Sequence, residues 1–204
     1  ALVEDDREIL GELGMRFLAA AATEAYGRVE LLAGEPARAE ATLRQGFDEL
    51  LEMQDRSALP TVAAMLAESL VELERWDEAL TIVGEAARRT DPGDLQAQVQ
   101  WRLPSAKTYA ALGRRKRALT HALEATEMAA GTDFLDLQGD AWYTLAEVER
   151  RIGRYDGARE AIGKANDAYT RKGNVVAASR SQVLERSLGA PGPVSRQRRR
   201  AADA

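Results

Sequence analysis

The 204-residue sequence contains one histidine, His121, and no cysteine, which restricts the chemistry that its side chains can perform. Without Cys there is no disulfide framework, no thiolate nucleophile and no Cys-ligated zinc, and a single His cannot build a multi-His metal site. His121 lies beside a predicted core position on a helix, where a packed or surface role is more common than general-base catalysis. No GxSxG motif, the mark of a nucleophilic serine, surrounds Ser57, Ser105 or Ser181.

Two other patterns superficially resemble ligand sites. Residues 157–164 read GAREAIGK, but five residues separate the glycines where a phosphate-binding loop has four, and Ala follows the lysine. Asp133, Asp136 and Asp140 share one helix face without the spacing of an EF-hand. We therefore predict no catalytic residue, no cofactor and no metal site, and we expect that the chain itself is not an enzyme.

A repeat predicts the elements that would position any binding residue. Four segments align, GEPARA, ERWDEA, GRRKRA and GRYDGA, and their final alanines fall at positions 39, 79, 118 and 158. Small residues also recur seven positions before each segment, at Gly27, Ala67, Ala106 and Ala146. Small residues at fixed spacing let two antiparallel helices approach closely, and the whole pattern resembles the tetratricopeptide helix–turn–helix repeat.

The predicted fold is therefore all-α, a tetratricopeptide-like right-handed superhelix of about four repeats with a C-terminal capping helix. The repeat domain covers 1–188, and the segment 189–204 is predicted to be a disordered, Arg-containing tail. Pro104 should kink its helix or delay its start. Repeats are expected near 15–54, 58–89, 94–131 and 135–171, with the cap at 174–188. Helices are expected near 15–33, 36–54, 58–73, 77–89, 94–112, 115–131, 135–152, 155–171 and 174–188, with a remnant helix at 4–12.

Composition and charge narrow the classes of partner. The chain is 45% hydrophobic with a net charge of −5, and no apolar run is long enough to span a membrane. The tail 189–204 carries four Arg and one Asp, so the remainder carries 24 basic and 32 acidic residues. The net negative charge, and the lack of aromatic residues interleaved among the cations, argue against a nucleic-acid partner. We expect a cytoplasmic protein without a membrane partner.

The predicted binding surface is the concave groove lined by the first helix of each repeat. Counting from the repeat register, exposed groove positions are expected at Glu24, Arg28, Thr61, Glu68, Gln100, Lys107, Asp140, Tyr143, Glu147 and Arg150. This set mixes both charge signs and contains one aromatic ring. It is suited to holding a protein or peptide partner through side-chain pairs.

The sequence also resembles a particular family. The likeness rests on GRVELLAG at 27–34, TVAAMLAE at 61–68, TDFLDL at 132–137 and RKGNVVAA at 171–178. These stretches are similar to the C-terminal helical-repeat region of bacterial, mainly actinobacterial, signal-transduction ATPases linked to class III adenylate/guanylate cyclases. Gln54 and Glu74 stand where relatives often have Gly, and Pro104 stands in a helix that is proline-free in the family.

Two functional hypotheses follow. The resemblance implies a non-catalytic regulatory module, the C-terminal arm of a larger cyclase- or ATPase-type signalling protein, which contacts a partner, another domain of the same polypeptide or a second copy. The alternative is a free-standing adapter that binds a peptide or protein in its groove. Neither hypothesis transfers a catalytic residue to this chain, because the cyclase aspartates and the ATPase phosphate loop have no counterpart here.

Overall fold

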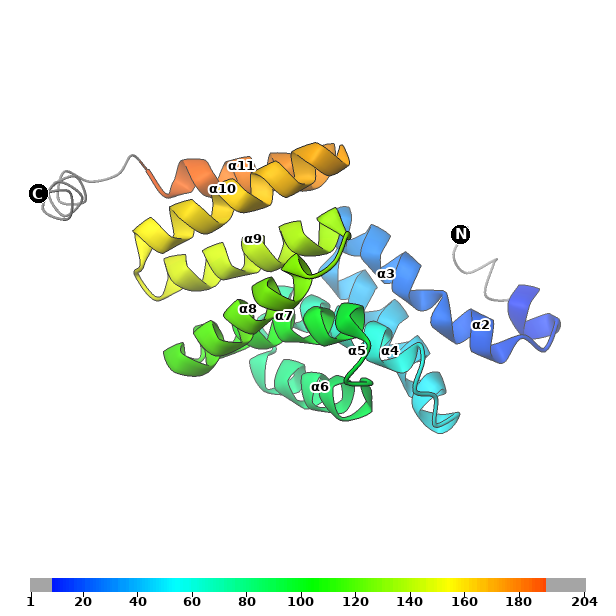
Figure 1. Cartoon of the computed structure of the whole chain (residues 1–204). Coiled ribbons are helices and arrows are strands. Elements are labelled where there is room, and N and C mark those ends of the chain that lie inside the picture. The colour runs from blue at the N-terminus through cyan, green and yellow to red at the C-terminus, as the bar shows by residue number, and fades with distance from the viewer. Residues whose placement is uncertain (1–8, 190–204) are drawn as a thin grey trace, which may run out of the picture.

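The computed structural model describes residues 9–189, and every regular element in that range is a helix (Figure 1). Residues 1–8 and 190–204, which include most of the predicted tail and part of the predicted remnant helix, lie outside the described residues. Residues 9–12 are helical. The following helices are α2 (Arg16–Ala21), α3 (Thr23–Leu32), α4 (Pro36–Glu52), α5 (Leu59–Glu72), α6 (Trp76–Arg89), α7 (Leu95–Ala111), α8 (Arg115–Ala130), α9 (Leu135–Arg151), α10 (Tyr155–Lys172) and α11 (Val175–Ser187).

The predicted helix at 15–33 is wrong in one respect, because the structure divides it into α2 and α3 at Ala22. The hydroxyl of Thr23 donates to the carbonyl of Ala20 at 2.6 Å, a side-chain bond that competes with regular helix geometry. Thr23 is fully buried against Gly46 of α4. The break therefore occurs where a polar side chain is held inside the packing interface.

Pro104 does not delay its helix, contrary to one of the two effects predicted for it. Helix α7 begins at Leu95 and continues through Pro104 to Ala111. The Thr108 hydroxyl donates to the Pro104 carbonyl at 2.8 Å, so this oxygen has a partner inside the turn that follows the proline. Asp94 caps the helix start by accepting from the Ala97 amide at 3.0 Å.

The helices pack as antiparallel neighbours in chain order, as an all-α helical repeat requires. Helix α3 packs on α4, α5 on α6, α7 on α8 and α9 on α10, while α5, α7 and α9 also contact one another in sequence. Helix α11 lies along α10 (Figure 1). In the described part of the chain no helix is both long and apolar enough to cross a bilayer.

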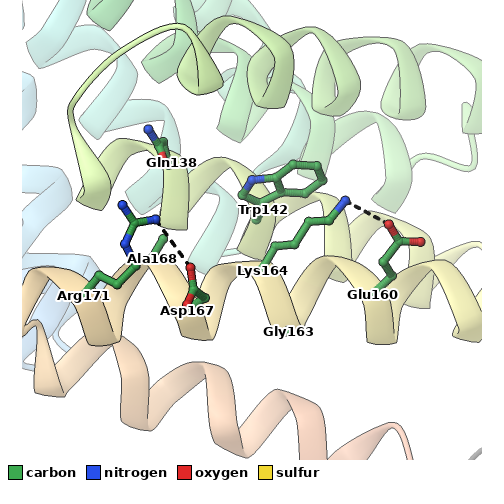
Figure 2. Close-up of a pocket in the computed structure, with 8 residues that line it drawn as sticks. All are labelled: Gln138, Trp142, Glu160, Gly163, Lys164, Asp167, Ala168 and Arg171. Atoms are coloured by element: carbon green, nitrogen blue, oxygen red, sulfur yellow. Dashed lines mark hydrogen bonds and ion pairs between the residues drawn. The ribbon is translucent and has the colours of Figure 1, made fainter.

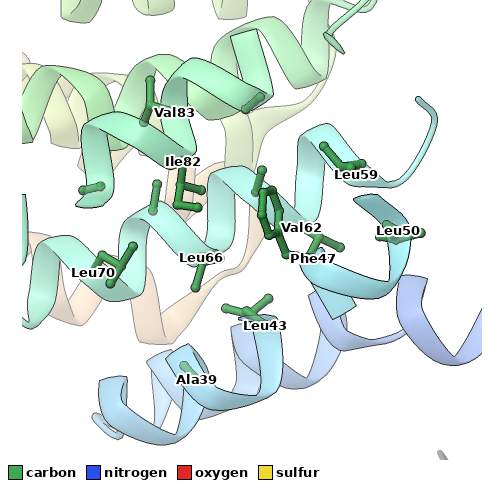
Figure 3. Close-up of a cluster of buried hydrophobic side chains, with 14 of the residues drawn as sticks. Ala39, Leu43, Phe47, Leu50, Leu59, Val62, Leu66, Leu70, Ile82 and Val83 are labelled. Carbon is green, nitrogen blue, oxygen red and sulfur yellow. The ribbon is translucent and has the colours of Figure 1, made fainter. Parts of the chain in front are cut away.

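The buried small residues confirm the spacing argument from the sequence. The repeat alanines Ala39, Ala79, Ala118 and Ala158 are all fully buried. Around them the N-terminal half of the core is filled by larger aliphatic residues, of which Figure 3 shows Leu43, Leu50, Leu59, Leu66 and Leu70. The C-terminal half instead packs alanines around Ile162 and Tyr169. A Cβ at Gly46 would lie 2.7 Å from the carbonyl oxygen of Ala20, so only glycine permits this approach.

The turns between paired helices depend on a left-handed residue. Gly34, Gly113 and Gly153 hold it with φ between 70° and 85°, whereas Glu74 holds the corresponding position with φ 57°. Gln54, in the turn after α4, has φ 56°. The two departures from Gly noted in the sequence are therefore positions where the backbone favours glycine.

Candidate functional site

Lys107 is the centre of a charged cluster that joins successive helices. Its ammonium group contacts Glu68 of α5 and lies 3.3 Å from Glu147 Oε2 of α9, while Lys107 itself belongs to α7. The Lys107 side chain is only 12% exposed, but those of Glu68 and Glu147 are 22% and 28% exposed. The cluster is therefore partly desolvated and still open to solvent on its carboxylate side.

A second group of polar side chains extends the cluster toward the C-terminal helix. The Tyr169 hydroxyl donates to Asp140 at 2.6 Å, and Arg180 of α11 lies 4.0 Å from the same carboxylate. The Arg180 guanidinium also stacks over the ring of Tyr143, 4.2 Å from its centroid. We call the eight residues Glu68, Glu72, Lys107, Asp140, Tyr143, Glu147, Tyr169 and Arg180 the Lys107 cluster.

The electrostatics of the cluster follow from partial burial and from its excess of carboxylates. Burial by itself would lower the pKa of Lys107, but Glu147 and Glu68 outweigh it and raise that pKa, so the lysine stays charged. Desolvation raises the pKa of Glu72 above its ordinary value, and repulsion from Glu68 and Glu147 acts in the same direction, although Lys107 opposes it. Glu72 forms no hydrogen bond or ion pair within residues 9–189. The cluster thus contains a carboxylate that its own cations do not fully stabilise.

Five of the predicted groove residues meet in this cluster. They are Glu68, Lys107, Asp140, Tyr143 and Glu147. Tyr143 and Lys107 depart from the prediction in one respect, since both were expected to be exposed. Tyr143 is only 8% exposed beneath Arg180, and the Lys107 side chain is largely buried between the two glutamates.

The other predicted residues have different surroundings. Arg28 pairs with Glu24 at 2.6 Å on α3. Burial raises the pKa of Asp140, and the charge of Arg28 is close enough to oppose that rise, so this pair lies at the margin of the cluster. Thr61 donates to the Ala58 carbonyl at 3.0 Å near the start of α5. Gln100 has a buried side-chain oxygen without a hydrogen-bond partner, and Arg150 is exposed. The structure does not bring Thr61, Gln100 or Arg150 into the Lys107 cluster.

Three residues of the cluster were not predicted from the sequence. Glu72 follows Glu68 by one helical turn, and that i, i+4 spacing was a usable signal. Tyr169 belongs to a second helix of a pair, and Arg180 to the capping helix, so neither lies on the helices assumed to line the groove. Finding them required knowing how α11 packs.

His121 is packed in an aromatic environment on α8. Its Nδ1 is 2.8 Å from the Ser105 hydroxyl, and its ring meets the edges or faces of Trp101 and Tyr109 at centroid distances of 5.5 and 5.3 Å. Burial lowers the pKa of His121, against the opposing effect of Glu124. Ser105 is completely buried, so this serine–histidine contact offers no approach to a substrate. We call Trp101, Ser105, Tyr109 and His121 the aromatic cluster.

A surface hollow of about 410 Å³ lies between α9 and α10 (Figure 2). Lys164 stands over the Trp142 ring, 4.2 Å from its centroid, and pairs with Glu160 at 2.8 Å. Arg171 pairs with Asp167 at 3.5 Å along the same helix. Because these charges are paired among themselves, the hollow presents less unsatisfied polarity than the Lys107 cluster. Over residues 9–189 no three His, Asp or Glu side chains are arranged to hold a metal ion.

Comparisons with known proteins do not assign this chain to a family. Neither the scan against family models nor the search of curated proteins returned a match. The geometry of residues 9–189 defines a class, an all-helical array of packed antiparallel helices, with a partly open charged cluster across α5, α7, α9, α10 and α11.

Proposed function

We propose that this chain is a non-catalytic interaction module that binds a protein segment over the Lys107 cluster. One observation supports the proposal most directly. Helices that are far apart in the sequence bring the charged side chains of Glu68, Lys107, Glu147 and Arg180 together on one connected surface. Incompletely compensated charges at a partly desolvated surface favour a ligand that supplies their missing partners.

The proposed architecture is a tetratricopeptide-like superhelix whose concave side carries this cluster. The periodic segments in the sequence and the pairwise packing of the helices support it. We further propose that the module is the regulatory arm of a larger cyclase- or ATPase-type signalling protein, on the basis of the resemblance of its repeat segments. In that setting, occupation of the cluster shifts the relative stability of two arrangements of the array and so biases a domain elsewhere in the polypeptide.

The test of the binding surface uses two matched charge reversals. Glu72 and Glu127 are both exposed and neither forms an ion pair in the described chain, but only Glu72 belongs to the cluster. We expect Glu72→Lys to abolish capture of partners from the source cell, while Glu127→Lys retains them. Hydrogen exchange should show that the captured partner protects α5, α7 and α9. Equal capture by both variants would contradict the proposal.

The regulatory part of the proposal has a separate test. The reading frame upstream of Ala1 should encode a cyclase or ATPase domain, and Glu72→Lys in that longer polypeptide should change nucleotide turnover without altering the catalytic domain. A start codon close to Ala1 would instead support the free-standing adapter. The proposal that the Lys107 cluster is the binding surface would not be affected by that result.

A further inference from the structure

We propose that the basic segment 196–200 of this chain docks on the Lys107 cluster. The segment reads RQRRR, with arginines at 196, 198, 199 and 200. The inference rests on the proposed function, because it takes the cluster to be the binding surface. It adds a specific occupant, which would compete with any external partner.

The charge balance of the cluster favours a cationic occupant. Four carboxylates, those of Glu68, Glu72, Asp140 and Glu147, face the two cations Lys107 and Arg180. These two cations leave the cluster with a net charge of −2. A ligand that supplies two or more positive charges would neutralise it.

A buried carboxylate oxygen without a hydrogen-bond donor indicates where such a ligand would bind. The Oε2 atom of Glu147 is buried and accepts no hydrogen bond, although Lys107 Nζ lies 3.3 Å away. A buried acceptor without a hydrogen-bond donor is costly, and carboxylates are well matched by the paired N–H groups of a guanidinium. Glu72 lies at the exposed rim of the same cluster and lacks an ion-pair partner in the described chain. Arginine side chains that bridge Glu72 and Glu147 would satisfy both groups.

The departure point of the segment makes this contact reachable within one molecule. Arg159 donates to the carbonyls of Leu188 and Gly189 at 3.0 and 3.2 Å, which fixes the end of α11 against α10. From Arg180 to Gly189 the helix axis advances about 14 Å. The seven residues from there to Arg196 span up to about 24 Å when extended. The chain is therefore long enough to return along α11 to the level of Arg180.

The experiment compares the full chain with two variants that each lose four cations. One carries R196Q/R198Q/R199Q/R200Q, and the control carries R56Q/R115Q/K116Q/K172Q, four exposed cations outside the cluster. NMR titration of the glutamate side chains at low salt should show a lower pKa for Glu72 in the full chain and in the control than in the tail variant. Identical Glu72 titration in all three proteins would overturn the proposal.

A second measurement, in trans, identifies the contact residues. A synthetic peptide of residues 190–204 is titrated into the tail variant, where amides of α5 and α9 should shift saturably. Adding E72Q/E147Q should weaken this binding about tenfold or more, because two charge-assisted contacts are lost, while E127Q leaves it unchanged. If the affinity for the peptide is the same with and without E72Q/E147Q, the proposed site is wrong.

The remaining outcomes separate this inference from the proposed function. If the effect of the tail grows with protein concentration, a second copy is the occupant and the intramolecular proposal is wrong. If an unrelated arginine peptide binds the cluster but residues 190–204 do not, the tail proposal fails and the binding surface stands. If neither peptide binds and Glu72→Lys captures the same partners as Glu127→Lys, both proposals fail.

Discussion

Helix α7 contributes to two clusters of polar groups, and the clusters differ in how completely their buried polar atoms are paired. In the aromatic cluster, Ser105 pairs with His121, and the indole N–H of Trp101 donates to Gln98 at 3.2 Å. In the Lys107 cluster, a single lysine is shared between Glu68 and Glu147, and one buried carboxylate oxygen lacks a hydrogen bond. The polar groups of the first cluster have hydrogen-bond partners within the protein, as buried groups usually do. The second cluster lacks hydrogen-bond donors for some of its carboxylates, and a ligand can supply them.

The largest expected effect comes from removing the cation that holds the Lys107 cluster together. Lys107→Met should lower the free energy of unfolding by about 2–4 kcal/mol, because it leaves three neighbouring carboxylates without their central partner. Urea denaturation at pH 7 measures the loss. Adding E68Q/E147Q to the same variant should recover most of it, since the uncompensated charges are then gone. A small loss in Lys107→Met would mean that solvent already screens the cluster.

The aromatic cluster should respond through packing and not through binding. His121→Ala removes the ring between Trp101 and Tyr109 and leaves the buried Ser105 hydroxyl without its partner, so we expect a loss of about 2–3 kcal/mol. In the R196Q/R198Q/R199Q/R200Q background, binding of the peptide 190–204 should be unchanged under conditions where the variant stays folded. Loss of peptide affinity in His121→Ala would show that the two sides of α7 are coupled and would break the comparison.

A stabilising substitution outside both clusters provides a control on these interpretations. Glu74 follows α5 and holds a left-handed backbone with φ 57°, where Gly occupies the equivalent position in the other turns. Glu74→Gly should raise the free energy of unfolding by about 0.5–1 kcal/mol, because it removes backbone strain. Thermal denaturation measures the gain. Affinity for the peptide should not move, and a matched Gly153→Gln should destabilise the fold by a comparable amount.

The two clusters differ in how much of each could be predicted from the sequence. The burial of Ala39, Ala79, Ala118 and Ala158 followed from their spacing, because a repeating helix pair places the same face inward each time. The register also placed Glu68, Lys107 and Glu147 among the exposed positions of the predicted groove, but it did not predict the ion pairs that join them. The position of Arg180 could not be predicted from the repeat register, because its contact with Asp140 and Tyr143 depends on how a helix outside the repeat pattern packs. Likewise, the burial of Tyr143 depends on that packing.

The smallest expected effect is on the pH dependence of the free energy of unfolding, to which the two clusters contribute with opposite signs. The pKa of Glu72 is raised above its ordinary value of 4.5, so the native state takes up this proton first and gains stability as pH falls toward 4.5. The pKa of His121 is lowered below 6.5, so the unfolded state takes up that proton first and stability falls as pH drops through 6.5. Each contribution should be smaller than the effects of Lys107→Met and His121→Ala.

Urea midpoints at pH 7 and pH 5 for the wild type, Glu72→Gln and His121→Asn separate these contributions. Glu72→Gln should remove a gain on acidification, and His121→Asn should remove a loss. If the Arg-rich segment occupies the cluster, its cations stabilise the ionised Glu72 and reduce the first effect, and 0.5 M salt should restore it by screening that contact. The aromatic cluster, which is closed by its own residues, should keep its pH response at both salt concentrations.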